Sequence, residues 1–491
     1  MNNKNKKLVP ADDKNAVSSY FSILSFLYLC LVSSLVDANT VTTLQLTSSD
    51  LSVNGYAYSG NGRRVVYVSR ANLTGQNPEG NSQVYLVDAN GAGLRQLTDL
   101  ASADSAGDIF ISEDGNIVVA KITTLVGAAD FQESILAINV QSGENRWLVP
   151  GSSRVLNLHA LSPNGEFTVY SYYQTPGTAG KVVRSVSTTG SYDNEITTYD
   201  ASSLLFFSAD TSTFIYNTNG VIYAVDVTGN RGWINNTNRV MEWTATSGAY
   251  AQATGISENG DKIAFYTNYD FTIGAVANFD DIYMVNTDGS GFARITHHNS
   301  NGDSNFPYFL QGSNKLLFPS DANINGENPN ANSNLYIYDI VNKSISQVTN
   351  FSEGYIAFNH TASKYQNRIV YAKSVTVYDY NTYLNSFDGA NEVIVNVESE
   401  SSSGIMSLNG KGFVFRSEKD ILGANADGSV ELFIRCENED NIDNACTALL
   451  TSGENSDETG GGGAFSLAFL LLVQLIFYGR ITSKLRPASY L

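Results

Sequence analysis

The sequence predicts an all-β protein: a β-propeller of four-stranded blades, with eight blades favoured and seven as the alternative. Three observations predict this fold. A unit of the form Ser-x-x-Gly-x-x-apolar-x-aromatic recurs about every 50 residues. Each unit contains several short strand patterns with no helical stretch between them. Only 16% of the 491 residues are charged, against roughly a quarter in typical soluble domains, whereas Tyr and Phe are abundant, as in pleated sheets.

The repeated unit occurs in eight places, and its central position is most often a glycine. Clear copies centre on Gly62, Gly115, Gly165, Gly260 and Gly410, and weaker copies on Thr211, Ser313 and Gln366. We expect the glycine to supply the positive φ of a tight hairpin turn. Eight copies predict eight blades; seven is the alternative if the copy around Gln366 is irregular.

Within each unit the order of the elements is regular. An alternating strand such as 65–68 follows the turn, and a Tyr-rich strand such as 84–88 follows a longer loop. A Leu-Thr, Ile-Thr or Val-Thr pair such as Leu97-Thr98 closes the unit. These features resemble the TolB-like propellers over about residues 45–455, and the resemblance implies this fold. Because its members include periplasmic partners of peptidoglycan-associated lipoproteins, it also implies a protein or polysaccharide partner.

The N-terminal segment reads as a signal peptide over residues 1–38. Four lysines precede an uncharged apolar stretch, and a cleavage position follows at Ala38. The alternative is an uncleaved N-terminal anchor. We therefore expect residues 39–450 to form an exported propeller.

The C-terminal segment is also predicted to be a targeting segment. Residues 451–463 form a polar, glycine-rich linker, and residues 464–491 combine an apolar stretch with a basic tail. This order resembles the GlyGly-CTERM sorting signal of Gram-negative envelope proteins. It implies transient inner-membrane anchoring, cleavage by a rhomboid-like protease, and display on the cell surface or secretion. The implied processing site is the glycine run Gly460, Gly461, Gly462 and Gly463. The alternative is a plain C-terminal anchor.

The net charge argues against one class of function, and the cysteines predict a disulfide. The net charge of −19 argues against nucleic-acid binding, for which a basic surface is expected. Cys436 and Cys446 flank an acidic stretch, and in an exported protein such an isolated pair is expected to form a disulfide. That bond would stabilise the fold by about 2–3 kcal/mol.

One stretch suggests a metal site. Asp321, Asn323 and Asn325, followed by Gly326, match the opening of a calcium-binding loop. The twelfth position is Asn332 rather than a bidentate glutamate, however. The alternative is a surface loop folded by Asn and Gly turn chemistry. Calcium is the only cofactor that the sequence suggests.

Catalytic motifs are not found. The sequence contains no nucleophile elbow, zinc-binding His-Glu-x-x-His or phosphate-binding loop. We expect His297-His298 to form an exposed turn, His159 to be structural, and Asp280-Asp281 to lie in a loop. No catalytic residue is assigned.

Two functions are therefore considered. The first is a non-catalytic binding module for a protein or polysaccharide of the cell envelope or outside the cell. The second is a propeller hydrolase or lyase acting on carbohydrate. It would require carboxylates and histidines that converge at the central funnel.

Overall fold

The computed structural model describes residues 40–438 except for short gaps. These gaps are 128–129, 174–180, 198–202, 212, 219–220, 227–238, 243–248, 299–301, 311, 313, 353–355, 363–367, 375–379, 387–392, 400–403, 408–409 and 411. The chain divides into two compact units, Met1–Ala448 and Leu449–Leu491, and all described residues belong to the first. Ala38, Cys446, the glycine run 460–463 and the segment 464–491 lie outside the described residues. No helix in the described part is long and apolar enough to span a membrane.

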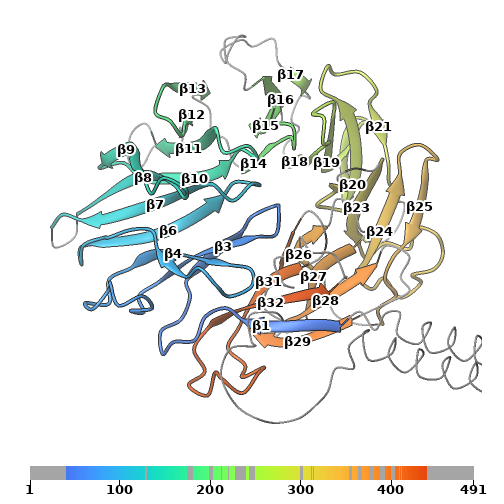
Figure 1. Ribbon diagram of the computed structural model, residues 1–491. Coiled ribbons are helices and arrows are strands. Elements are labelled where there is room, and N and C mark those ends of the chain that lie inside the picture. The colour runs from blue at the N-terminus through green and yellow to red at the C-terminus, as the bar shows by residue number, and fades with distance from the viewer. Residues whose placement is uncertain are drawn as a thin grey trace, which may run out of the picture. The chain divides into compact units, whose positions relative to one another are not determined.

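The described strands form eight four-stranded antiparallel sheets that follow one another in chain order (Figure 1). In the β14–β17 and β26–β29 sheets the side chains are described only in part. The strands are β2–β5 (Gly55–Tyr58, Arg64–Ser69, Gln83–Asp88, Arg95–Gln96), β6–β9 (Asp104–Ile111, Ile117–Leu125, Phe131–Asn139, Asn145–Ser152), β10–β13 (Leu156–Leu161, Phe167–Tyr173, Lys181–Ser187, Asp193–Thr197), β14–β17 (Ser203–Phe207, Thr213–Thr218, Val221–Asp226, Arg239–Glu242), β18–β21 (Ala251–Ile256, Lys262–Asp270, Ala275–Asn286, Ala293–Arg294), β22–β25 (Tyr308–Leu310, Lys315–Ser320, Asn334–Asp339, Ser344–Gln347), β26–β29 (Ile356–Ala362, Arg368–Ser374, Tyr380–Ser386, Val393–Ser399), and β30–β32 with β1 (Ile405–Met406, Gly412–Ser417, Glu431–Asn438, Thr40–Gln45).

The turns between the first and second strands explain the repeated Ser-x-x-Gly. Gly62 has a φ of +72°, and the other central glycines of the clear copies have similar values. Thr211, in a weaker copy, takes the same left-handed conformation. The serine three places earlier caps the turn: Ser59 Oγ accepts a hydrogen bond from the Arg64 backbone N–H at 3.0 Å. The turn prediction is therefore confirmed.

The core is divided among the contacts between neighbouring sheets. Each apolar cluster joins two consecutive sheets; Val66 of β3 and Val118 of β7, for example, belong to one cluster. The last sheet packs on the first through Val414 and Tyr58, which share another cluster. Every sheet therefore buries both faces against its neighbours, as the blades of a propeller do. An all-β propeller of four-stranded blades is confirmed.

The last sheet is completed by the first described strand of the chain. β1 pairs with β32, and Leu44 lies opposite Ile434. Beyond β1, the Leu432 backbone N–H donates to Thr47 Oγ1 at 2.8 Å. The sequence prediction did not include this closure. The sequence feature that could have indicated this closure is Leu46-Thr47, a closing Leu-Thr pair that lies near the N-terminus, before the first repeated unit.

The closing threonines hold the third strand of their sheets. Thr98 Oγ1 donates to Gln83 Oε1 at 2.8 Å and accepts from the Val84 N–H at 2.9 Å. Thr296 and Thr349 make the equivalent bonds to Asp281 and Asn334. Each of these threonines is thus bonded to a buried polar side chain of the third strand, which is the first residue of the strand at Gln83 and Asn334 and an internal residue at Asp281. In the β18–β21 sheet this side chain is the carboxylate of Asp281, and the candidate site lies around it.

Candidate functional site

Three loops between second and third strands share one internal architecture. In the 321–333 loop, Asn328 is 3% exposed. Its Nδ2 donates to the carbonyl oxygens of Asp321 and Ala322, at 3.2 and 3.3 Å, and of Asn332 at 2.8 Å. Its Oδ1 accepts from the Asn332 N–H at 3.1 Å. Asn77 and Asn425 occupy the same position in the 70–82 and 418–430 loops. A buried asparagine therefore folds each loop.

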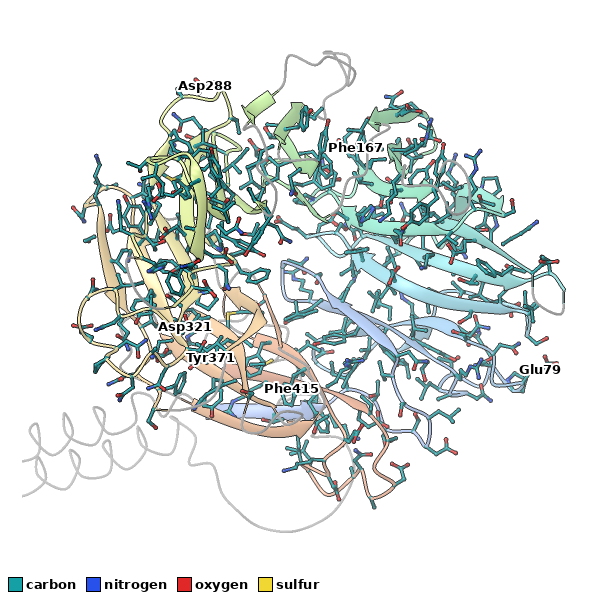
Figure 2. All side chains as sticks on the ribbon, turned by 180° about the vertical axis from the view of Figure 1, so that it is seen from behind. Glu79, Phe167, Asp288, Asp321, Tyr371 and Phe415 are labelled. Atoms are coloured by element: carbon teal, nitrogen blue, oxygen red, sulfur yellow. The ribbon has the colours of Figure 1, made fainter. Side chains whose placement is uncertain are left out.

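The suggested calcium ligands are used inside this architecture. Asp321, labelled in Figure 2, accepts the Asp303 N–H at 2.6 Å. Asn323 Oδ1 accepts the Asn328 N–H at 2.9 Å, and Asn325 Nδ2 donates to the Ile345 carbonyl at 2.8 Å. Among the described residues no three His, Cys, Asp or Glu side chains group as metal ligands. The contacts favour the alternative of a loop folded by Asn and Gly chemistry.

A cavity of about 500 Å³ lies between this loop and the end of the preceding sheet. Its apolar lining comes from Ile295, Ala322, Ile324, Pro329, Ala331 and Ile345, and its polar lining from Thr296, His297, His298, Asn323 and Asn328. The loop and the segment after β21 therefore form a mixed apolar and amide-rich site of small-ligand size.

Behind the cavity, Asp281 holds the segment 294–298. It is 3% exposed and accepts hydrogen bonds from Thr296 Oγ1, the His298 N–H and Arg294 Nη2. Arg294 also donates to Asp270 at 3.0 Å. Asp280 and Asp281 lie inside β20, so the prediction that they occupy a loop is wrong. The reason is that β19 and β20 pair beyond Thr267, where other sheets have the asparagine loop.

His298 is buried beside this carboxylate, with a side chain 4% exposed. Its Nε2 lies 2.7 Å from Ser304 Oγ and 3.7 Å from Asp281 Oδ1. Burial lowers the pKa of His298, although Asp281, Asp303 and Asp321 act in the opposite direction. The expected exposure is confirmed for His297 and is wrong for the His298 side chain, which is buried and forms a hydrogen bond with Ser304.

Asp280 makes a separate group with the residues around it. The Tyr250 hydroxyl donates to Asp280 Oδ2 at 2.6 Å, and the Asp280 N–H donates to Asp303 Oδ1 at 2.8 Å. Burial raises the pKa of Asp280 to about 6; the hydrogen bond from Tyr250 opposes this shift, and Asp303 and Asp281 add to it. The pKa of Asp280 therefore lies within about one unit of neutral pH.

The other histidines and the predicted disulfide lie elsewhere. His159, in β10, forms a 2.7 Å hydrogen bond with Ser171, which supports a structural role; burial lowers its pKa to about 4. His360 lies in β26, and its side chain is outside the described residues. Cys436 is buried in β32 and is disulfide-bonded. Because Cys446 is not among the described residues, the Cys436–Cys446 pairing stays a prediction.

Comparison with known proteins finds similar folds only. No family model matches the chain, and no curated protein matches it. An oligogalacturonate lyase from Vibrio parahaemolyticus is 12% identical, with 82% of this chain and 95% of that chain covered and a TM-score of 0.45. TolB from Acinetobacter baumannii is 13% identical over 69% of this chain and 80% of that chain (TM-score 0.37). The propeller domain of the Trilobed protease from Pyrococcus furiosus is 12% identical over 70% and 99% (TM-score 0.44).

Proposed function

We propose that the protein is a non-catalytic binding module for a protein or polysaccharide, with its site at the cavity between the β18–β21 sheet and the 321–333 loop. The observation that carries this proposal is the cavity itself. It has about 500 Å³, a size that ligand sites commonly have, and its lining combines apolar side chains with a larger share of polar groups. The rigid sheets on both sides hold the loop that forms one wall.

The pairing of the carboxylates supports binding rather than turnover. A glycosidase needs two carboxyl groups that face the substrate from opposite sides of the scissile bond. Here Asp281 is bonded to Arg294 and Thr296, and Asp321 to the Asp303 backbone. These groups stabilise the walls of the site.

The proposal also covers the cellular location of the protein and the number of propeller blades. We propose that residues 1–38 direct export, and that residues 464–491 anchor the chain until cleavage at the glycine run. The product would be displayed on the cell surface or secreted. We also propose that the eight sheets are the blades of one ring closed by β1. Fractionation of cells that carry the chain with or without residues 464–491 tests the proposed cellular location. Finding the intact, unprocessed chain in the inner membrane would contradict it.

Blocking the cavity tests the binding proposal. Ile345 lines the cavity, whereas Val341, four residues earlier, is 69% exposed. The protein recovered after export is incubated with envelope polysaccharides and with solubilised envelope proteins. Ile345→Trp should reduce capture of the ligand about tenfold or more, and Val341→Trp should not. Equal capture by both variants would contradict the proposed site.

A second candidate function is favoured by Asp280. A carboxyl with a pKa of about 6 beside a tyrosine hydroxyl is suited to general acid catalysis on a carbohydrate. In that case Asp280→Asn would abolish release of reducing ends from a bound polysaccharide and leave binding intact. If the unmodified protein releases no reducing ends, this second function is wrong and binding stands as the proposed function.

A further inference from the structure

Most polar atoms that line the cavity already have partners within the protein. Thr296 Oγ1 bonds to Asp281 and to the Ile282 N–H, and the Asn328 amide is held by the loop backbone. Among the described lining residues, the exposed His297 makes no side-chain hydrogen bond, and two other side chains each make one and keep one further hydrogen-bonding atom. They are His298 and Asn323, which lie on the two elements that face each other across the cavity.

The hydrogen bonds around His298 fix which ring nitrogen carries the proton. Ser320 Oγ donates to the Asp303 carbonyl at 2.8 Å, and Ser304 Oγ donates to Ser320 Oγ at 2.8 Å. The Ser304 hydroxyl proton is therefore engaged, and its oxygen accepts from His298 Nε2. In the neutral ring that burial favours, Nδ1 is then a hydrogen-bond acceptor.

The loop fixes the orientation of Asn323 in the same way. Its Oδ1 accepts the Asn328 N–H at 2.9 Å, which leaves Nδ2 as a donor. Asn72 makes the same bond to Asn77 in the 70–82 loop, and Asp420 makes it to Asn425 in the 418–430 loop. An aspartate is therefore compatible with this loop architecture, although it has no donor to offer a ligand.

One acceptor, one donor and the isoleucine side chains of the same mixed lining match an acetamido group. We propose that the cavity binds the acetamido group of an N-acetylated amino sugar in a neutral polysaccharide. The acetamido N–H donates to His298 Nδ1, its carbonyl accepts from Asn323 Nδ2, and its methyl group packs against Ile295, Ile324 and Ile345. This inference rests on the proposed function and names the ligand class.

Size and charge favour the sugar. The volume of about 500 Å³ far exceeds that of an acetamido group, so the cavity has room for the ring that carries it. Three carboxylates, those of Asp281, Asp303 and Asp321, and one guanidinium, that of Arg294, interact electrostatically with His298, and this excess of negative charge makes the site unfavourable for anionic ligands. Acidic polysaccharides are thereby disfavoured.

Calorimetry with four tetrameric or peptide ligands tests the class. The exported full chain should bind a β-1,4-linked N-acetylglucosamine tetramer about tenfold or more tighter than a glucose tetramer. A glucosamine tetramer that binds as tightly as the acetylated one would show that the site responds to positive charge, and would overturn the proposal. Preferential binding of an acetyl-lysine peptide would overturn the sugar assignment.

Variants at Asn323 test the contact directly. Asn323→Asp keeps the acceptor for the Asn328 N–H and removes the donor, so the N-acetylglucosamine tetramer should bind about tenfold more weakly at an unchanged melting temperature. Asn72→Asp makes the same change in the 70–82 loop and should bind normally. His298→Gln, which keeps an N–H for Ser304 and lacks Nδ1, should also weaken binding. Unchanged binding in Asn323→Asp would overturn the proposal.

Together with the Ile345→Trp variant, these binding measurements distinguish failure of the acetamido assignment from failure of the proposed binding site. If no sugar binds but Ile345→Trp still blocks capture of another envelope ligand, the acetamido assignment is wrong and the binding function stands. If Ile345→Trp blocks nothing, the proposed site is wrong as well.

Discussion

The Tyr250 hydroxyl donates a hydrogen bond to the Asp280 carboxylate at 2.6 Å, although Asp280 is only 8% exposed and Tyr250 is 44% exposed. Burial and the neighbouring Asp303 and Asp281 raise the pKa of this carboxyl to about 6, and the hydrogen bond from Tyr250 is the contact that opposes the rise. A partly exposed phenol thus limits the cost of ionising a buried acid.

This relationship predicts a pH-dependent stability. Because the pKa of Asp280 is raised from 3.8 to about 6, the native state binds this proton more tightly than the unfolded chain does. The stabilisation is complete below pH 3.8 and is lost as the pH rises through about 6. Asp280→Asn should therefore raise the melting temperature at pH 7.5, by about 2 °C, and leave it nearly unchanged at pH 3.5.

Differential scanning calorimetry at the two pH values measures the effect. Tyr250→Phe is the companion variant, because it removes the opposing hydrogen bond and should move the pKa of Asp280 further upward. An equal change of melting temperature at both pH values in Asp280→Asn would contradict the titration of this carboxyl.

The anchoring role of Asn328 predicts a local loss of structure. Asn328→Ala removes three donated hydrogen bonds and one accepted bond in a buried site, and should cost about 2–3 kcal/mol of unfolding free energy. Asn330→Ala, an exposed position in the same loop, is the control. Urea unfolding and limited proteolysis of the 321–333 loop measure both variants; equal stability of the two would refute the role of Asn328.

Local features of the fold were predictable from sequence, because they depend on neighbouring residues. The Ser59–Gly62 turn is decided within a few positions, and each strand shows its own alternation. Ser69 and Tyr85 stand sixteen positions apart, as do Ser320 and Tyr336, and the strands of the two sheets pair in equal registers.

The candidate site depends on longer-range pairing. Asp281 receives its partners Arg294 and Thr296 from the closing strand, and His298 is buried by Ser304. The spacing from Thr267 to Tyr283 equals that of the loop-bearing sheets, so it gives no sign that strands extend there. The register up to Thr267 is the same as in the loop-bearing sheets, and only the additional pairs Tyr269–Val276 and Asp270–Ala275 distinguish the two arrangements.

The disulfide prediction can be tested on the exported protein. Cys436 is disulfide-bonded, and we expect Cys446 as its partner. Peptide mapping without reductant should yield one cross-linked peptide pair that contains both cysteines. Reduction should lower the free energy of unfolding by about 2–3 kcal/mol. A cross-link from Cys436 to Cys30 would show that the leader is retained and that the pairing is wrong.

Closure by β1 predicts that a single hydroxyl near the N-terminus stabilises the C-terminal sheet. Thr47 is 4% exposed, and its Oγ1 accepts the Leu432 N–H at 2.8 Å. Thr47→Val keeps the shape of the side chain and leaves this buried N–H without an acceptor, at a cost of about 1–3 kcal/mol. Thr47→Ser keeps the oxygen and should retain most of the stability.

Replacing residues 40–45 by a Gly-Ser segment in the full chain tests the same closure more severely. β32 would become an exposed edge, because its pairing partner β1 is lost. Size-exclusion chromatography should then show aggregation at a concentration where the unmodified protein elutes as one species. A replaced chain that elutes unchanged and melts at the same temperature would show that β1 does not hold the ring closed.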